Sequence, residues 1–277
     1  MEFWESYQKL PLLVSPTAFQ VGFFDISWYA IMYFLAFLTI YALLKFRKKK
    51  GELRSLSFDI LDFLVCAMLG ALIGGRLGYV FYDWGAFQEN LWLAISPYNF
   101  ETGFWTGIYG MSYHGGFVGA LLASWLFSYW NRSDFWQLAE FVIPAVPLGY
   151  FFGRIGNFLN GELYGKIIES RWGMNFGDGF LRLPNQLLEA FFEGLLIFTV
   201  LWLLRNNSRF RGWLLPIYII SYAVIRFLLD FLREPDGLYA PLGGLIAWSQ
   251  IFSLWMLILG LLIYSWKKYR KNVIISK

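Results

Sequence analysis

The stretch at residues 58–81 reads FDILDFLVCAMLGALIGGRLGYVF and decides the fold class of this chain. Its charged residues are two aspartates near the start and Arg76 near the end, and every residue between them is apolar or glycine. An α-helix rises about 1.5 Å per residue, so about nineteen residues give roughly 28 Å, close to the hydrocarbon thickness of a membrane. The pattern therefore predicts a transmembrane helix.

Six further apolar runs predict spans at residues 26–44, 115–130, 135–152, 186–204, 213–232 and 245–266. The chain of 277 residues is 58% apolar and only 15% charged, with a mean hydropathy of +0.49, whereas a soluble domain is about a quarter charged. We therefore expect an all-α polytopic membrane protein with seven transmembrane helices, extracytoplasmic loops and short interfacial helices. No linker or low-complexity tract divides the sequence, so residues 1–277 are predicted to form a single membrane domain.

The first twenty residues do not resemble a cleavable signal peptide, because Glu2 and Glu5 interrupt them and a continuous apolar core is missing. We expect a short interfacial segment there. Cys66 is the only cysteine and His114 the only histidine. A disulfide within the chain, a cysteine metal site and a zinc site with two histidines are therefore excluded, and Cys66 is interpreted as a small interior residue.

The basic residues predict the orientation of the chain. Fifteen of the 23 Lys and Arg residues follow the first, third, fifth and seventh spans, and six lie on the other side. Since Lys and Arg gather in cytoplasmic loops, the N-terminus is predicted to be extracytoplasmic and the C-terminus cytoplasmic. The basic loops are then topology signals, so nucleic-acid binding is not expected. The long loops at residues 82–113 and 153–185 face outward and are predicted to form most of an extracytoplasmic head. The fifteen residues are Lys45, Arg47, Lys48, Lys49, Lys50, Arg54, Arg132, Arg205, Arg209, Arg211, Lys267, Lys268, Arg270, Lys271 and Lys277.

Ionisable residues inside the spans are costly and usually mark a function or a buried pair. Arg226 and Asp230 are four residues apart and share one helix face, so they are either a neutralising pair or part of a site. Glu189 and Glu193 also share a face and need a cationic partner, for which Arg76 and Arg154 are the candidates. Glu140 is the remaining residue of this kind.

A short pattern occurs twice, as Gly75-Arg76-Leu77-Gly78 and again as Gly153-Arg154-Ile155-Gly156. Both copies end spans that are predicted to run outward. Glycines permit close helix packing or close approach of the backbone to a ligand, and two guanidinium groups at this depth could bind an anion in bidentate fashion. The local anion is lipid phosphate, although snorkelling to the interface also explains many such arginines.

The densest polar run of the chain is GRIGNFLNGELYG at residues 153–165. It brings one cation, one carboxylate and two amides to the end of a span, and we expect irregular backbone there. Such backbone at membrane depth is tolerated only where it is buried in protein or lines a wet cavity. We therefore expect a functional site around Arg154, Asn157, Asn160 and Glu162.

Two further residues lie near outward ends of predicted spans. His114 begins the third span, where it is either a structural residue or a group that transfers protons. Tyr29 begins the first span, where it either belongs to the aromatic belt or serves the site. The residues alone leave both alternatives open.

The run at residues 153–165 resembles the signature of the prolipoprotein diacylglyceryl transferase family, G-R-x-G-N-F-x-N-x-E-x-x-G, at every fixed position. Further similar segments follow in the same order as in the family, at residues 28–29, 74–79, 114–116, 184–189, 226–227 and 233–236. The resemblance implies a bacterial plasma (inner) membrane enzyme that transfers a diacylglyceryl group from phosphatidylglycerol to the lipobox cysteine of a prolipoprotein signal peptide. The expected products are a thioether-linked prolipoprotein and glycerol phosphate, and the partners are these two substrates and the bilayer.

The resemblance also implies site residues. Arg154 is expected to bind the lipid head group, with Asn157, Glu162 and Gly165 shaping that site and Tyr29, His114 and Arg226 functionally important. Expulsion of a phosphate ester needs preorganised cations, for which Arg154 and Arg226 are suited, with Arg76 in support. A thiol with a pKa near 8.5 needs a base or a positive field, and His114 is the economical base. The predicted catalytic residues are His114, Arg226, Tyr29, Asn157 and Glu162, and the predicted substrate-binding residues are Arg154, Gly165, Arg76, Asn160, Asp230 and Glu189. No metal or cofactor is expected.

Four positions depart from the family pattern. Leu183 and Leu188 stand where the family usually has His and Tyr, Asp230 where it commonly has Glu, and Ala30 where it usually has Gly. The missing histidine therefore has no role here, and none of the changes touches residues 153–165. Two other classes of protein were compared with the transferase. A lipid or solute transporter would also use intramembrane charges, whereas an intramembrane protease lacks support because no Gly-x-Ser-x-Gly motif is present.

Overall fold

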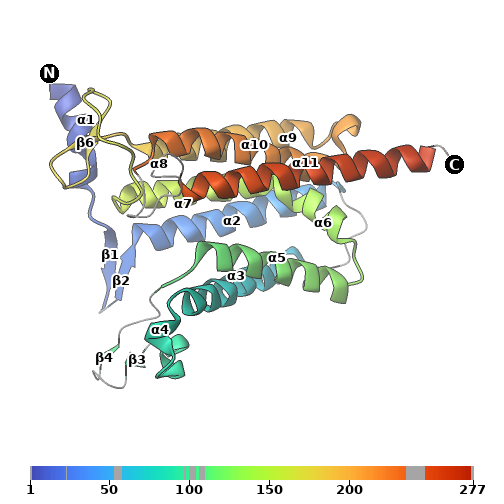
Figure 1. Cartoon of the computed structure of the whole chain (residues 1–277), viewed down its shortest axis with the longest axis horizontal. Coiled ribbons are helices and arrows are strands. Elements are labelled where there is room, and N and C mark those ends of the chain that lie inside the picture. The colour runs from blue at the N-terminus through green and yellow to red at the C-terminus, as the bar shows by residue number, and fades with distance from the viewer. Residues whose placement is uncertain are drawn as a thin grey trace. The chain divides into compact units, whose positions relative to one another are not determined.

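The structure is a computed structural model that describes residues 2–22, 24–52, 58–96, 98–99, 104–105, 110–234 and 247–275 (Figure 1). The described residues are mostly helical, with short two-stranded antiparallel sheets. They form two compact units: unit 1 comprises Met1–Glu52 and Ala139–Lys277, and unit 2 comprises Leu53–Leu138. The fold class, a mostly helical polytopic membrane protein, agrees with the prediction, whereas the single membrane domain stays a prediction.

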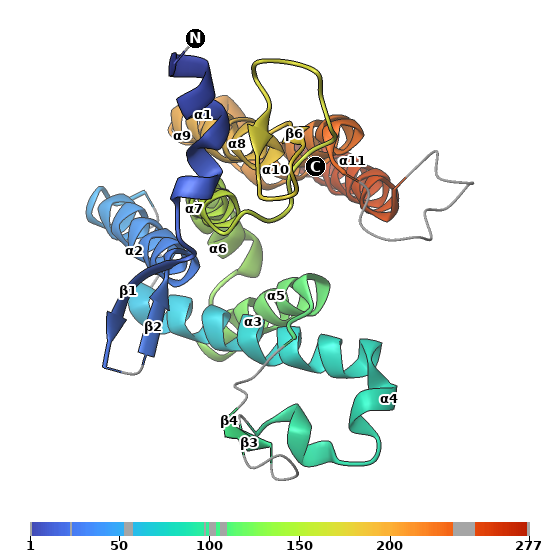
Figure 2. The ribbon, with the colours of Figure 1, turned by 90° about the vertical axis from the view of Figure 1, so that its left-hand side faces the viewer.

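Unit 1 begins with a short helix and a hairpin and continues as a bundle of long helices. Its elements are α1 (Glu2–Leu13), β1 (Thr17–Val21), β2 (Phe24–Ser27), α2 (Trp28–Lys49), η2 (Ile143–Ala145), α7 (Val146–Leu159), β5 (Met174–Asn175), β6 (Leu181–Arg182), α8 (Asn185–Glu189), η3 (Ala190–Leu196), α9 (Ile197–Leu204), η4 (Ser208–Phe210), α10 (Leu214–Leu229), η5 (Asp230–Leu232) and α11 (Trp248–Ile275); α6 (Phe135–Val142) straddles both units. Figure 2 shows the bundle from its end, where α7 lies between α2 and α10.

The apolar faces of α9 and α10 meet in the core of unit 1. Ile197, Leu201, Leu214 and Tyr222 are buried there. Burying such side chains contributes roughly 1.5–3 kcal/mol each. This packing places the end of α10 that carries Arg226 next to the start of the span at Asn185–Leu204.

Unit 2 contains α3 (Ile60–Tyr82), α4 (Trp84–Phe87), η1 (Leu91–Ala94), β3 (Tyr98–Asn99), β4 (Phe104–Trp105) and α5 (Tyr113–Trp130). Helices α3 and α5 pack against each other along a row of glycines. A Cβ added to Gly74 would collide with the carbonyl of Gly115 and lie 2.7 Å from Cα of Gly119. Small residues at every fourth position allow membrane helices to approach this closely, and their absent side chains explain the contact.

The predicted spans agree with the structure except in detail. Within the described part of the chain, six helical stretches are long and apolar enough to cross a membrane by length and composition: Trp28–Lys49, Ile60–Tyr82, Phe135–Leu159, Asn185–Leu204, Leu214–Leu232 and Trp248–Tyr269. The predicted span at residues 115–130 is helix α5, 18 residues long. It is not among the six because polar and aromatic residues at its ends lower its hydropathy, yet it lies antiparallel to α3 along its length. The count of seven is therefore approximate.

The structure corrects two predicted boundaries. The loop expected to start at Gly153 starts at Asn160, because α7 continues to Leu159, so most of the polar run is helical. The first span starts at Trp28, where the side chain of Ser27 caps the helix by accepting a hydrogen bond from N of Ala30. Residues 245–246 of the last predicted span, Arg54 and residues 235–236 of the family pattern lie outside the described residues.

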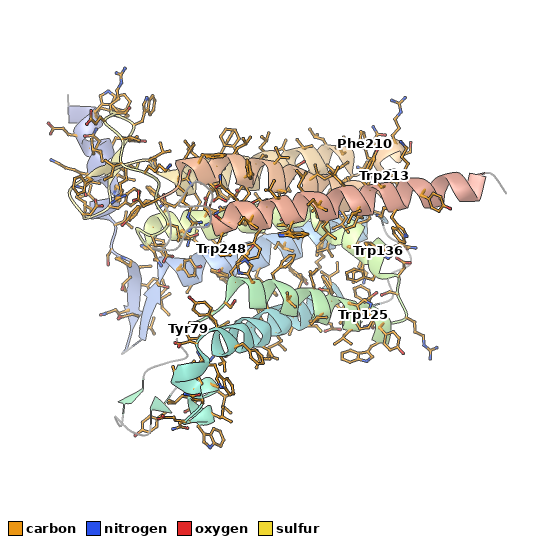
Figure 3. The ribbon with its side chains drawn as sticks, viewed as in Figure 1. Tyr79, Trp125, Trp136, Phe210, Trp213 and Trp248 are labelled. Carbon is orange, nitrogen blue, oxygen red and sulfur yellow. The ribbon has the colours of Figure 1, made fainter. Side chains whose placement is uncertain are left out.

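Aromatic rings lie at both ends of the helices of each unit (Figure 3). In unit 1, Phe210 and Trp213 lie at one end and Trp248 lies at the start of α11, toward the other end. In unit 2, Tyr79 and Trp125 lie toward opposite ends of the helix pair. Aromatic side chains at two levels are typical of helices that cross both interfaces of a membrane.

Candidate functional site

The candidate site begins with Arg154, which extends from α7 in the last turns before the helix ends. Its Nε donates to the hydroxyl of Tyr150 at 2.7 Å, and its Nη1 donates to Oδ1 of Asn157 at 3.2 Å. Both partners lie on the same helix, four residues before and three after the arginine, so helix geometry brings them together. Arg154 is 13% exposed, and its Nη2 has no hydrogen-bond partner among the described residues.

A second arginine, Arg226, lies on α10 near the helix end and is surrounded by carboxylates. Its Nη2 lies 2.8 Å from Oδ1 of Asp230, and its Nη1 lies 2.7 Å from Oε1 of Glu189 and 3.7 Å from Oε2 of Glu193. The predicted neighbourhood of Arg226 and Asp230 is therefore confirmed. Glu189 and Glu193 are 0% exposed, and buried carboxylates require such pairing.

Glu189 joins the two arginines, because each of its oxygens lies beside one guanidinium. Oε2 lies 2.9 Å from Nε of Arg154, outside hydrogen-bond geometry because that N–H points toward Tyr150. The sequence suggests Arg76 and Arg154 as cationic partners of Glu189, and the structure places Arg154 beside it. The Arg154–Arg226 cluster is defined here as Tyr150, Arg154, Glu189, Glu193, Arg226 and Asp230. Three helical spans contribute to it, at Phe135–Leu159, Asn185–Leu204 and Leu214–Leu232.

A chain of amides continues from the cluster into the loop after α7. Nδ2 of Asn157 donates to Oε1 of Glu162 at 2.9 Å, and Nε2 of Gln186 donates to the carbonyl of Glu162 at 2.6 Å. Asn157 thereby connects Arg154 with Glu162. Among the described residues, buried side-chain oxygens without a hydrogen-bond partner lie on Asn160, Asn185, Gln186, Glu189, Glu193 and Asp230. Buried polar atoms are nearly always paired, so this concentration marks the region as one that is built to contact something else.

The loop next to the amide chain is tightly constrained. Leu163 has a left-handed backbone (φ 60°), which is unusual for a bulky residue. Gly165 donates its N–H to the carbonyl of Leu183 at 2.8 Å, and a Cβ added to it would lie 2.7 Å from the carbonyl of Leu232. A cavity of about 330 Å³ is lined by Gly161, Glu162, Leu163, Tyr164 and Glu234. The predicted site residue Glu162 therefore lines a cavity, and Gly165 directly follows the lining residue Tyr164 in the chain.

Tyr29 lies at the start of α2 and contacts α7 at the same end of unit 1. Its hydroxyl is 3.1 Å from that of Tyr33, and a Cβ added to Gly156 would lie 3.0 Å from its ring. The glycine after Arg154 therefore makes room for the Tyr29 ring. Tyr29 joins the predicted residues Arg154 and Asn157 on adjacent turns of two packed helices.

Unit 2 carries the other two predicted residues. Arg76 donates to the carbonyls of Leu93 and Ala94 at 2.6 Å each and to the carbonyl of Gly110 at 3.2 Å. These contacts tie the loop after α3 to the helix end. His114 is exposed in the first turn of α5, with its ring edge-on to Tyr113. The functional roles of Arg76 and His114, including an anion site shared by Arg76 and Arg154, stay predictions.

An ion pair outside the spans holds the loop that follows the site. Arg182 pairs with Asp178 and lies 3.1 Å from Oε2 of Glu234. Burial raises the pKa of the Asp178 carboxyl, but hydrogen bonds from Arg182 and from N of Phe180 outweigh this and hold the pKa below its usual value. This ion pair, named the Asp178–Arg182 lock, therefore holds the loop beside the cavity.

Sequence reasoning missed Tyr150, Asn185 and Gln186 as site residues. Asn185 and Gln186 are 0% exposed, and Asn185 donates to Oε1 of Glu189 at 3.0 Å. The position of Tyr150, four residues before Arg154, could have indicated a contact, but a tyrosine in an apolar span is usually read as an interface residue. Glu193 was recognised as an intramembrane charge and was not assigned to the site.

The arrangement can bind an anion next to a cation that is already held in place. Arg154 is positioned by Tyr150, Asn157 and Glu189, so its remaining N–H groups need little reorganisation when a phosphate arrives. Arg226 is largely committed to carboxylates and is suited to holding Glu189 and Asp230. Arg154 and Arg226, both of which the sequence suggests as preorganised cations, therefore have different surroundings.

Comparisons of the sequence with known proteins identify its family. Residues 16–266 match the family model described as prolipoprotein diacylglyceryl transferase. The phosphatidylglycerol–prolipoprotein diacylglyceryl transferase of Chlorobaculum tepidum is 39% identical over 98% of this chain and 96% of its own length. Proteins of the same name from Campylobacter lari and Campylobacter jejuni are each 38% identical, covering 99% and 98% of this chain and 100% and 99% of their own lengths. The chain therefore belongs to the prolipoprotein diacylglyceryl transferase family.

Proposed function

We propose that this transferase moves the diacylglyceryl group of phosphatidylglycerol to the thiol of a lipobox cysteine in a prolipoprotein signal peptide. The thiol sulfur forms a bond to the glyceryl carbon, the bond from that carbon to the phosphate oxygen breaks, and glycerol phosphate leaves. The observation that carries the proposal is the guanidinium of Arg154, held at Nε by Tyr150 and Glu189 and at Nη1 by Asn157, with Nη2 uncommitted among the described residues.

The proposed role of Arg154 follows from the charge that develops in the reaction. A phosphodiester carries one negative charge, and the departing phosphate monoester carries a second that grows as the bond breaks. A positioned guanidinium stabilises this charge most in the transition state. Removing one such preorganised donor in other enzymes costs about a hundredfold to a thousandfold in rate.

Arg226 is proposed to act mainly through its carboxylate partners. Its ion pairs with Glu189 and Asp230, at 2.7 and 2.8 Å, hold Glu189 where it also meets Arg154. Asp230 is one methylene shorter than the glutamate usual in the family, and it still reaches Arg226. Glu189, Arg226 and Asp230 therefore support the phosphate-binding arginine.

The head group is proposed to lie along the amide chain and the cavity next to it. Asn157 and Glu162 present a donor and carboxylate oxygens, and Asn160 has a buried unpaired oxygen. These groups are suited to a head group that carries hydroxyls. Gly165 keeps the loop close to Leu232, and Tyr29 covers the adjacent turn of α7.

The thiol proton requires an acceptor, for which we propose His114. Only a few per cent of an ordinary thiol is ionised at neutral pH, and imidazole has a pKa that suits proton transfer at that pH. The test is the pH dependence of kcat/KM. His114→Gln should lose the acidic limb of the profile, whereas an unchanged limb would exclude His114 as the base.

The proposed location is the bacterial inner membrane, with the N-terminus extracytoplasmic and the C-terminus cytoplasmic. The basic residues after α2, between α9 and α10, and in α11 gather at one end of unit 1, as the contact of Arg205 with Glu52 and that of Lys267 with Gly212 indicate. The positive-inside rule assigns this end to the cytoplasm. The Arg154–Arg226 cluster then faces outward, where prolipoproteins arrive.

The proposed function is tested by incubating the purified protein with radiolabelled phosphatidylglycerol and a lipobox peptide. Transfer of label to the peptide cysteine is expected from the wild type and not from Arg154→Ala, which should still insert and fold. A lipid transporter would instead move labelled lipid across a liposome membrane without forming a thioether. Label transfer by Arg154→Ala at the wild-type rate would contradict the phosphate-binding role proposed for Arg154.

A further inference from the structure

We propose that Tyr150 and Glu193 form a positioning pair that aims Arg154 at the phosphate of the lipid substrate. The inference rests on the proposed function and adds two residues to it. The Tyr150 hydroxyl accepts a hydrogen bond from Nε of Arg154 at 2.7 Å and donates one to Oε2 of Glu193. Glu193 thus fixes the direction of the hydroxyl, and the hydroxyl fixes the arginine.

The burial of Glu193 is the first argument. It is 0% exposed, its Oε1 has no hydrogen-bond partner among the described residues, and its distance to Arg226 is 3.7 Å, longer than the 2.7 Å from Arg226 to Glu189. A carboxylate in the interior is costly unless it is well paired. Arg226 already has two closer carboxylates, so pairing with Arg226 does not explain why a buried carboxylate is tolerated at Glu193. The hydrogen bond that Glu193 accepts from Tyr150 explains it.

The directionality of the hydrogen bonds is the second argument. A guanidinium only donates, so Tyr150 must use an oxygen lone pair toward Arg154 and has one proton left to donate. Glu193 accepts this hydrogen bond from the hydroxyl, and such a charge-assisted hydrogen bond is about twice as strong as a neutral one. Without this acceptor the hydroxyl could rotate, and Nε of Arg154 would keep only Glu189.

The helix that carries Glu193 is the third argument. Asn185, Glu189, Glu193, Ile197 and Leu201 are spaced by four residues and all are at most 3% exposed. An α-helix drifts about 40° per four residues, or about 160° over this stretch, which would turn one end toward lipid. The π-helix at Ala190–Leu196 turns less per residue and removes much of this drift. Its course therefore keeps Glu193 on the interior face.

Close packing fixes the pair against α7. A Cβ added to Gly194 would lie 2.7 Å from Cβ of Phe151, the residue after Tyr150. The missing side chain at Gly194 lets the π-helix approach α7 at the level of Tyr150. The charged and titratable groups around Glu193 are Tyr150 and Arg154 from α7, Arg226 and Asp230 from the span at Leu214–Leu232, and Glu189 from its own span. Tyr222 of α10 packs edge-on against Tyr150, with ring centroids 5.7 Å apart.

The test is a double-mutant cycle in which Tyr150→Phe is made in the wild type and in Arg154→Lys. The variants are compared in nanodiscs of phosphatidylcholine by the rise in unfolding temperature that added phosphatidylglycerol causes, and by kcat/KM for transfer. In the wild-type background, Tyr150→Phe should lower kcat/KM at least about tenfold, because a hydrogen bond to a charged group is lost. The loss should appear in kcat and in KM for phosphatidylglycerol and not in KM for the lipobox peptide, because Arg154 acts on the lipid phosphate.

In the Arg154→Lys background the same change should have less than about a threefold effect, because residues that act through a shared partner are not additive. Equal losses in both backgrounds, or wild-type kcat/KM and lipid-induced stabilisation in Tyr150→Phe, would overturn the proposal. The lipid-induced shift decides the comparison if Arg154→Lys is inactive. A wild-type protein without transferase activity would refute the proposed function, while this shift would still test the pair.

Substitutions at Glu193 give a second, independent arm. Glu193→Gln keeps an acceptor for Tyr150 and should retain more kcat/KM than Glu193→Leu, which keeps none. Tyr41→Phe and Glu140→Gln, at the opposite end of unit 1, are the matched controls and should leave KM for phosphatidylglycerol unchanged. If Glu193→Leu matches Glu193→Gln in KM, Glu193 does not orient Tyr150. Either result stands even where Tyr150→Phe fails to fold.

Discussion

The two ends of unit 1 both hold clusters of buried or half-buried charged residues, and they differ in how completely the charges are paired. At one end lie Arg47, Glu52, Glu140, Arg205 and Lys267; this set is called the Glu140 cluster. At the other end lies the Arg154–Arg226 cluster. The first has three cations for two carboxylates and the second two cations for three carboxylates.

Every carboxylate oxygen of the Glu140 cluster has a partner. Glu52 accepts from Nε of Arg47 at 2.6 Å and from Nε of Arg205 at 3.3 Å. Glu140 accepts from the backbone N–H groups of Leu214 and Leu215 at 3.1 and 3.2 Å and from Lys267 at 3.2 Å. It therefore caps the first turn of α10, where a negative charge also complements the helix dipole.

The Arg154–Arg226 cluster leaves oxygens unpaired and carries more negative than positive charge. Proteins tolerate incomplete pairing of this kind chiefly where function requires it. We therefore interpret the completely paired Glu140 cluster as a structural clamp and propose the incompletely paired cluster as the site. Substitutions at each end of unit 1 test this difference between the two clusters.

Removal of Arg226 should have the largest effect. Arg226→Ala leaves Asp230 buried without this cation and leaves Glu189 with Arg154 alone, which should destabilise the protein by about 3–5 kcal/mol. The measurement is the thermal unfolding midpoint in detergent. Adding Glu189→Gln and Asp230→Asn to Arg226→Ala should recover part of the loss, because neutral side chains need no counter-charge; no recovery would mean that Arg226 acts through packing.

Removal of Arg154 should separate activity from stability. Arg154→Ala should lower kcat by about a hundredfold to a thousandfold, with little change in the unfolding midpoint, since Arg226 still pairs with Glu189. Arg205→Ala is the matched change at the other end and should retain most of the activity. Comparable activity losses in the two variants would contradict the division into site and clamp.

Glu140→Ala should show the reverse behaviour. Losing the cap of α10 should cost about 1–2 kcal/mol, and Lys267 loses its carboxylate. Transferase activity of the protein that remains folded should stay near the wild-type value. Unfolding midpoint and specific activity are measured on the same preparation, and Glu140→Gln should restore part of the stability. A specific activity reduced as strongly as in Arg154→Ala would assign Glu140 to the site.

The smallest effect is expected from the Asp178–Arg182 lock. Because the pKa of Asp178 is lowered in the folded protein, its contribution to stability is complete above the ordinary pKa near 4 and is lost as the pH falls through the lowered value. The pair is partly exposed, so the contribution should stay below about 1 kcal/mol. Asp178→Asn should flatten this part of the pH–stability curve, and an unchanged slope would show that the lock contributes nothing.

Much of the site could be predicted from the sequence where residues are neighbours on one helix. The spacing of Arg226 and Asp230 predicts their proximity, and Arg154 was one of two partners proposed for Glu189. The predicted loop start at Gly153 is wrong, because the apolar run ends at Phe152 whereas α7 continues through the polar signature to Leu159. The glycines of the signature do not end the helix, and Gly156 admits the ring of Tyr29.

The amino-acid sequence by itself determined the membrane spans, the gathering of basic residues at one end and the family signature, since hydropathy and local spacing suffice for these. Only the tertiary structure decided that Glu189 bridges Arg154 and Arg226, and that Glu193 reaches Tyr150, 43 residues earlier. These contacts join different helices, so they depend on how each helix is rotated about its axis. They also depend on the π-helix at Ala190–Leu196, which the sequence does not reveal because buried residues four apart also occur in an ordinary α-helix. The role of each arginine therefore follows from the partners that packing brings to it.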